Sequence, residues 1–110
     1  MNTLANLNDL TFSEHIKKEK GLIILNFIAE WCGPCKILAP ILETISKEES
    51  IKVFKVNVDE NPDLAFEYGI TSVPVTMFID EGSRIGQING MKSKEEFREK
   101  LNEFRQFKFL

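Results

Sequence analysis

The sequence predicts an α/β fold with a mixed central β-sheet, and two features of its pattern indicate that fold. Apolar segments rich in β-branched and aromatic residues alternate with segments whose apolar residues recur at helical spacing. The chain then finishes with a predicted hairpin and one more helix. Because strand–helix alternation favours parallel strands and a hairpin adds antiparallel ones, we expect an α/β sandwich with a mixed sheet. With 110 residues, the chain is predicted to form a single domain, residues 1–110.

The elements follow from apolar periodicity and from punctuation by Gly and Pro. The run from residue 22 to 29 is almost continuously apolar, which is typical of a strand buried on both faces. Pro40 falls inside a predicted helix and is expected to kink it. In chain order we predict helix Thr11–Lys20, strand Leu22–Ala29, a helix from Pro34, strand Ile51–Val58, a helix from Asn61-Pro62 to Gly69, strands Val75–Ile79 and Arg84–Ile88, and a helix from Ser93.

Helix ends are marked by capping patterns. Thr11 with Glu14, and Ser93 with Glu96, have the spacing of a capping box. Asn61 is expected to cap the short helix that begins at a first-turn proline. At the C-terminus, Phe97, Leu101 and Phe104 lie on one helical face and predict contact with the core. Phe107 continues that stripe, and we expect Phe109 and Leu110 to pack rather than remain exposed.

Composition and charge exclude several classes of protein. Hydrophobic residues make up 43% and charged residues 28% of the chain, which is ordinary for a globular domain and argues against disorder. The net charge is only −3 and the lysines are scattered, so no basic face for nucleic acid is predicted. No apolar run approaches a membrane span, and the N-terminus does not resemble a secretory signal. We expect a cytosolic protein, in which a close cysteine pair is more often catalytic or metal-binding than structural.

The two cysteines, Cys32 and Cys35, flank Gly33 and Pro34 where a predicted strand gives way to a helix. Since a free thiol has a pKa of ~8.5, thiol chemistry at neutral pH needs a feature that stabilises the thiolate. Cys32 precedes the helix, so unpaired N–H groups and the helix dipole are expected to stabilise its anion. We therefore expect Cys32 to attack a disulfide and the less exposed Cys35 to resolve the mixed disulfide. Gly33 admits a substrate backbone, and Pro34 suits a first helical turn.

Three other roles for the cysteine pair compete with thiol–disulfide exchange. A structural disulfide that closes so short a loop would constrain the unfolded chain very little. A zinc site normally takes four ligands, and beyond the pair the chain offers only His15 unless ligands are shared across a dimer. His15 as the base of a cysteine hydrolase would have to reach Cys32, and nothing in the sequence places it there. Redox exchange is the strongest interpretation of the pattern.

The cysteine segment and several downstream positions resemble the thioredoxin family. The resemblance covers essentially the whole chain in order and spacing. It implies a thioredoxin fold, in which helices flank the mixed central sheet on both faces. The matching residues are Ala29-Glu30-Trp31-Cys32-Gly33-Pro34-Cys35-Lys36, Pro40, Ser72-Val73-Pro74 and Asn89-Gly90.

The resemblance also implies roles for individual residues. Pro74 matches a proline that the family holds in the cis form facing the active site, and Val73 would offer its backbone to an extended substrate. Lys55 matches a lysine beneath the site, although an ordinary exposed strand lysine is the alternative. Trp31 is expected to cover the site rather than lie in the core. The apolar rim that docks partner proteins would consist of Trp31, Gly33, Pro34, Val73, Pro74 and Gly90.

The chain departs from the family pattern at Asn26 and Ile28. Thioredoxins usually carry a buried aspartate at the first position and often a tryptophan at the second. The aspartate is thought to relay the proton of the resolving cysteine, whereas Asn26 can form hydrogen bonds but cannot accept that proton at neutral pH. Water or a neutral Lys55 would then serve as the base. A specialised member of the family with reduced activity is the alternative that Asn26 leaves open.

The resemblance implies a monomeric thiol–disulfide oxidoreductase that reduces client proteins and is recharged by thioredoxin reductase, which uses a flavin and NADPH. We expect the protein to need no cofactor or metal of its own and to bind neither nucleic acid nor a membrane. A binding module in which the cysteines are incidental is a second possibility. An oxidant or isomerase on the same fold is a third, but the Gly33-Pro34 pair favours the reducing role.

Overall fold

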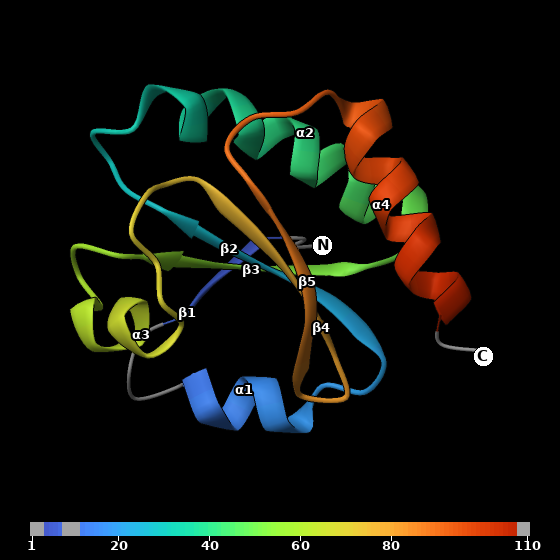
Figure 1. Ribbon diagram of the computed structural model, residues 1–110, viewed down its shortest axis with the longest axis horizontal. Coiled ribbons are helices and arrows are strands. Elements are labelled where there is room, and N and C mark those ends of the chain that lie inside the picture. The colour runs from blue at the N-terminus through green and yellow to red at the C-terminus, as the bar shows by residue number, and fades with distance from the viewer. Residues whose placement is uncertain (1–3, 8–11, 108–110) are drawn as a thin grey trace.

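The computed structural model describes residues 4–7 and 12–107 and confirms an α/β fold built on one mixed sheet (Figure 1). The sheet has five strands in the order β1-β3-β2-β4-β5. β1, β3 and β2 are parallel, and β4 runs antiparallel to both β2 and β5. The strands are β1 (Leu4–Leu7), β2 (Leu22–Ile28), β3 (Lys52–Asn57), β4 (Val75–Asp80) and β5 (Ser83–Asn89), and the helices are α1 (Phe12–Lys18), α2 (Gly33–Glu49), α3 (Pro62–Glu67) and α4 (Lys94–Phe107).

Helices cover both faces of the sheet, as predicted (Figure 1). Side chains alternate between the two faces along each strand, so β2 contributes to two separate cores. α1 and α3 pack on one face, where Phe12, Ile16 and Leu64 join Leu25 and Phe27. α2 and α4 pack on the other face; their core with the sheet contains Ile24, Val53, Phe78, Leu38, Leu42, Ile45, Phe97 and Leu101. A strand buried on both sides is thereby confirmed for β2.

All the predicted elements are present, and one further strand was not anticipated. β1 consists of four residues and pairs in parallel with β3, from Leu4 opposite Val53 to Leu7 opposite Val56. Because β1 and β3 lie nearly fifty residues apart in the chain, their pairing leaves no local pattern from which β1 could be predicted. α1 ends at Lys18, two residues earlier than predicted, and the Thr11 cap lies outside the described residues.

The helix punctuation is partly as predicted. Ser93 and Glu96 form the capping box, with Glu96 N–H donating to Ser93 Oγ at 3.2 Å and Ser93 N–H donating to Glu96 Oε1 at 3.1 Å. Asn61 occupies the N-cap position of α3 but makes no side-chain capping bond; its Nδ2 donates to the Asn57 carbonyl at 3.0 Å. α2 continues through Pro40 without interruption, and the kink stays a prediction.

α4 packs against the core through its apolar face. Phe97 and Leu101 are buried, and the Phe104 ring lies 4.7 Å from that of Phe78. Phe104 also lies against Gly86, where any Cβ would clash with the ring. The core stripe is thus confirmed to Phe104, while the Phe107 side chain, Phe109 and Leu110 lie outside what the structure describes.

Ion pairs complete the contact between α2 and α4. Glu49 accepts from Arg98 at 3.1 Å and from Arg105 at 2.9 Å. Arg105 also donates to the Glu49 carbonyl, which lies at the C-terminus of α2, where cations are favoured by the helix dipole. These contacts hold the end of α2 that is remote from the cysteines. Within residues 4–7 and 12–107, no helix is both long and apolar enough to span a membrane.

Candidate active site at the start of helix α2

Cys32 is the N-cap residue of α2 and Cys35 lies in its first turn. The extended backbone of Cys32 (φ −88°, ψ 104°) directs its Sγ at the helix end, where it accepts the Cys35 N–H at 3.1 Å. The two sulfurs are joined in a disulfide, and the Cα atoms are 5.3 Å apart. The predicted placement of one sulfur at the mouth of a helix is therefore confirmed.

The two cysteines are buried to the same extent. Cys32 is 3% and Cys35 4% exposed, so the expectation that Cys35 would be the less exposed residue is wrong for this oxidised form. The sulfurs are bonded to each other and share one apolar surrounding of Ala29, Val58 and Val73, which explains the similar burial.

The local sequence explains how the chain reaches this geometry. Buried β2 ends at Ile28, and a tight turn in which the Cys32 N–H donates to the Ala29 carbonyl at 3.2 Å leads into α2. Gly33 and Pro34 form the first helical positions, one residue earlier than predicted, and both are exposed. Pro34 lacks an N–H at a position where the helix needs none.

Trp31 lies on the surface beside the disulfide. It is 71% exposed, which excludes a core role, and its indole Nε1–H donates to Asp59 Oδ2 at 2.7 Å. Asp59 is itself held by Asn57, whose Oδ1 accepts the Asp59 N–H at 2.9 Å. Sequence reasoning missed Asp59, because only the fold brings the end of β3 next to the turn after β2. The Asn-x-Asp spacing at a strand end is the one local signal of this turn.

Three residues that are distant from the cysteines in sequence lie together, and one of them packs against the disulfide. The Val73-Pro74 peptide bond is cis, as the resemblance implied. Val73 packs against the cluster of Ala29 and the two cysteines. The Gly90 N–H donates to the Pro74 carbonyl at 2.9 Å, with Gly90 at φ 81°, a conformation that favours glycine. The predicted Val73, Pro74 and Gly90 are therefore together at one edge of the site.

Asn26 lies in a polar row on the sheet face that α2 and α4 cover. It is 2% exposed and stands in register with Lys55 of β3 and Thr76 of β4. Its Nδ2 donates to the Val75 carbonyl at 3.2 Å and to Thr76 Oγ1 at 3.5 Å. Lys55 is half-buried rather than fully exposed, and Ile28, further along β2, packs against the cysteine cluster. Asn26 is thus a buried amide with its donor satisfied, in place of a buried charge.

The remaining candidates do not belong to this site. His15 is exposed on α1, which packs on the sheet face opposite α2, and its ring lies 5.9 Å from that of Phe54. It cannot act as a base for Cys32 from there. Among the described residues, no three His, Cys, Asp or Glu side chains gather as a metal site would require.

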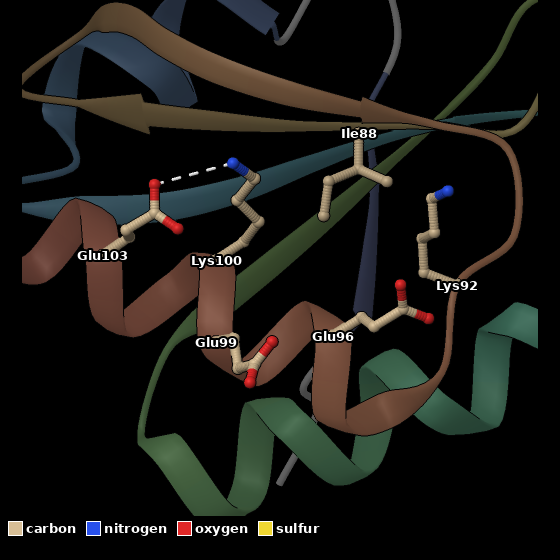
Figure 2. A pocket seen from close by; sticks show the side chains of 6 residues that line it. All are labelled: Ile88, Lys92, Glu96, Glu99, Lys100 and Glu103. Carbon is tan, nitrogen blue, oxygen red and sulfur yellow. Dashed lines mark ion pairs between the residues drawn. The ribbon is translucent and has the colours of Figure 1, made fainter.

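A hollow of about 260 Å³ lies between β5 and α4, away from the cysteines (Figure 2). Three of its charged groups are engaged within α4: Lys100 pairs with Glu103 at 3.5 Å, and Glu96 caps the helix. The hydrogen bond from the Ser93 backbone holds the pKa of Glu96 below its usual value. The hollow is lined by Ile88, Lys92, Glu96, Glu99, Lys100 and Glu103.

Comparisons with known proteins agree with this geometry. The thioredoxin family model matches residues 3–103. The chain is 43% identical to a thioredoxin of Buchnera aphidicola subsp. Acyrthosiphon pisum, over 94% of this chain and 97% of the relative. It is 38% identical to thioredoxin 1 of Synechococcus elongatus, over 86% and 90%. The crystal structure of thioredoxin NaTrxh from Nicotiana alata superposes with a TM-score of 0.85 at 27% identity, over 93% and 92%. The chain therefore belongs to the thioredoxin family and is a thiol–disulfide oxidoreductase.

Proposed function

We propose that the chain reduces disulfides in client proteins, with Cys32 as nucleophile and Cys35 as resolving residue. The Cys32 thiolate attacks one client sulfur, forms a mixed disulfide and expels the other client sulfur as a thiolate. Cys35 then loses its proton and attacks Cys32 Sγ, which releases the second client thiolate and closes the disulfide. Two electrons pass to the client. The observation that carries this assignment is the Cys35 N–H that donates to Cys32 Sγ at the mouth of α2, since the same group stabilises a thiolate.

The surface around the disulfide supports client docking. Gly33 has open space where a Cβ would lie, so a client backbone can approach closely there. Within the described residues, Val73 makes no backbone hydrogen bond, and its N–H and C=O are free to pair with an extended client segment. The Asp59 carboxylate fixes the Trp31 ring as one wall of this surface. We assign docking to Trp31, Gly33, Pro34, Val73, Pro74 and Gly90.

Beneath the site, Asn26 and Lys55 shape the proton transfer that resolution requires. Because the Asn26 amide uses its Nδ2 on Val75, its oxygen is the group left to accept a hydrogen bond. An amide oxygen orients a thiol or a water but does not take up its proton. Resolution in this chain therefore depends on water or on a neutral Lys55, and its rate rises with pH.

Recharging completes the cycle. After each turnover the Cys32–Cys35 disulfide must receive two electrons, and thioredoxin reductase, which uses a flavin and NADPH, is the donor that membership in the family implies. The chain carries no cofactor of its own in this scheme. It acts as a single-domain monomer, residues 1–110, in the cytosol.

Insulin reduction tests the proposal. The wild-type chain with dithiothreitol should accelerate precipitation of the insulin B chain, and Cys32→Ser should abolish the acceleration. Cys35→Ser should instead stall as a covalent adduct that reductant releases, visible on a non-reducing gel. Because both cysteines are equally buried, loss of packing is matched between the two variants. If Cys32→Ser trapped adducts and Cys35→Ser did not, the assigned roles would be reversed.

A further inference from the structure

Helix α3 lies at the same end of the sheet as the start of α2, which carries the disulfide (Figure 1). Val58, just before the α3 segment, packs against the cysteine cluster, and its N–H donates to the Ile28 carbonyl at 2.9 Å. Val73, just after the segment, packs against the same cluster. Asp59 is bonded to Trp31 at 2.7 Å. The segment between Val58 and Val73 therefore leaves the active site after Val58 and returns to it at Val73.

The outward face of α3 combines one large apolar side chain with carboxylates. Asp63, Phe66 and Glu67 stand three and four residues apart and share one exposed helix face, whereas Leu64 and Ala65 are buried. Phe66 is 89% exposed, the most exposed of the large apolar residues that the structure describes. A single exposed apolar residue is common on protein surfaces. Phe66 differs from such a residue because carboxylates share its helix face and because the active site lies at the same end of the sheet. We call Asp63, Phe66 and Glu67, together with Glu60, which is exposed two residues before the helix, the α3 face.

The charge on this segment is unbalanced. Residues 56–72 contain four carboxylates and no lysine or arginine, whereas the whole chain carries a net charge of only −3. Among residues 4–7 and 12–107, none of these carboxylates takes part in an ion pair, in contrast to Glu48 and Glu49 of α2. The carboxylates of the α3 face therefore carry negative charge that no ion pair of the described residues neutralises.

Arg84, the cation whose contacts lie on this segment, is bound at Tyr68 rather than at a carboxylate. Arg84 stacks over the Tyr68 ring at 5.4 Å and donates to the Tyr68 carbonyl at 3.0 Å. Burial raises the pKa of Tyr68, the Glu67 charge raises it further and Arg84 opposes the change, so Tyr68 stays neutral at physiological pH. Lys36 is exposed one residue beyond Cys35, on α2. Since residues 56–72 contain no lysine or arginine, Glu60 and Asp63 have no cationic neighbour on their own segment.

We propose that the α3 face is a specificity surface that selects clients carrying basic and apolar residues next to the disulfide to be reduced. The inference rests on the proposed function, because it concerns which clients reach the Cys32 sulfur. Three observations favour this occupant: continuity with Trp31 through Asp59, unpaired negative charge, and an exposed phenyl ring. Lysine or arginine of the client pairs with Glu60 and Asp63 while an apolar client side chain covers Phe66. Such charge complementarity acts mainly on the rate of encounter.

Three peptides with one intramolecular disulfide test the inference. They share a sequence except for two positions outside the disulfide ring, which hold lysines, serines or glutamates, and a leucine adjoins that pair. We expect kcat/KM to follow the order lysine, serine, glutamate at low ionic strength. The lysine peptide should exceed the serine peptide by about three- to tenfold, the range that two exposed charge pairs support. High salt should bring the three values together.

Charge-matched variants locate the effect. Glu60→Gln with Asp63→Asn removes two charges from the α3 face, and Glu95→Gln with Glu99→Gln removes two from α4. Only the first pair should lower kcat/KM for the lysine peptide to that of the serine peptide. Phe66→Ser should lower kcat/KM for the leucine-containing peptides several-fold, whereas Ile85→Ser, at another exposed apolar residue on β5, should not. Asp59 is left unchanged throughout because it holds Trp31.

The outcomes are separable. Equal loss in both charge variants would indicate a general net-charge effect and would overturn the inference. Equal rates for all three peptides would overturn it while leaving the disulfide-reductase function intact, whereas no reduction of the serine peptide would refute that function itself. Sedimentation at micromolar concentration adds one more outcome. A dimer that Phe66→Ser dissociates would show that a second copy covers the α3 face, and the inference would fail.

Discussion

Replacement of Asn26 by aspartate tests how the polar row of Asn26, Lys55 and Thr76 across the sheet is stabilised. The Asn26 Nδ2 donates to the Val75 carbonyl at 3.2 Å, and the residue is 2% exposed. In Asn26→Asp an ionised carboxylate would set an acceptor against that carbonyl and lose its hydration. Leaving a buried polar group unpaired costs about 1–3 kcal/mol. The protonated acid, in contrast, can still donate an O–H to Val75, so the cost depends on pH.

The sign of that dependence follows from linkage. Burial raises the folded-state pKa of the new carboxyl above its unfolded value of ~3.9. Below the unfolded pKa both states are protonated and the variant is nearly as stable as the wild type. As pH rises towards the folded pKa, the unfolded chain ionises alone, and each pH unit costs about 1.4 kcal/mol. Two units above the unfolded value the loss reaches about 3 kcal/mol, a large part of the 5–15 kcal/mol typical of a domain.

Urea unfolding of the oxidised proteins, followed by circular dichroism between pH 4 and pH 8, measures this loss. Asn102→Asp, an exposed site on α4, is the matched control and should show a small difference that does not grow with pH. A constant difference between Asn26→Asp and wild type across this range would refute the argument for burial. Stopped-flow resolution of a mixed disulfide should be faster in Asn26→Asp, because the carboxylate can accept the Cys35 proton. An unchanged rate would remove the proton-transfer role of this position.

Three further substitutions probe the surroundings of the site. Asp59→Asn, which exchanges a charged acceptor for a neutral one at Trp31, should raise KM for peptide disulfides several-fold with kcat unchanged, as steady-state kinetics will show. Glu49→Gln should lower the free energy of unfolding by about 1 kcal/mol, and the loss should shrink in 1 M salt, measured by urea titration. Ser93→Ala should return the lowered pKa of Glu96 towards normal in an NMR titration, although the backbone bond remains. In wild type this pair stabilises α4 above the ordinary glutamate pKa, and the benefit is lost as pH falls through the lowered value.

Local pattern predicted most of the fold. β2 was recognised because a strand buried on both faces has an almost continuous apolar sequence, and α4 because Phe97 and Leu101 recur at helical spacing beside a capping box. β1 was missed because its four residues gain their stability from pairing with β3, which is remote in sequence. Asn61 was correctly predicted as the N-cap residue of α3, but its side chain makes no capping hydrogen bond, and its Nδ2 donates to the Asn57 carbonyl instead.

The residues of the candidate site also fall into those that local sequence could place and those that it could not. Cys32 and Cys35 could be placed at a helix end from sequence, because strand, motif and helix are contiguous. Pro74 and Gly90 were placed there by family resemblance alone, as no local pattern brings them to the cysteines. Asp59 and the α3 face were not anticipated. Both depend on how the segment after β3 folds back against Trp31, which is a property of the tertiary structure.

The hydrogen bond from the Cys35 amide to Cys32 Sγ can persist through turnover. The same N–H serves a disulfide sulfur in the oxidised protein and a thiolate in the reduced one, so the opening turn of α2 keeps its hydrogen-bond partner through the whole electron cycle. Catalysis then requires little change in the backbone. Protection of the amides in the first turn of α2 from hydrogen exchange should be alike in the two redox states.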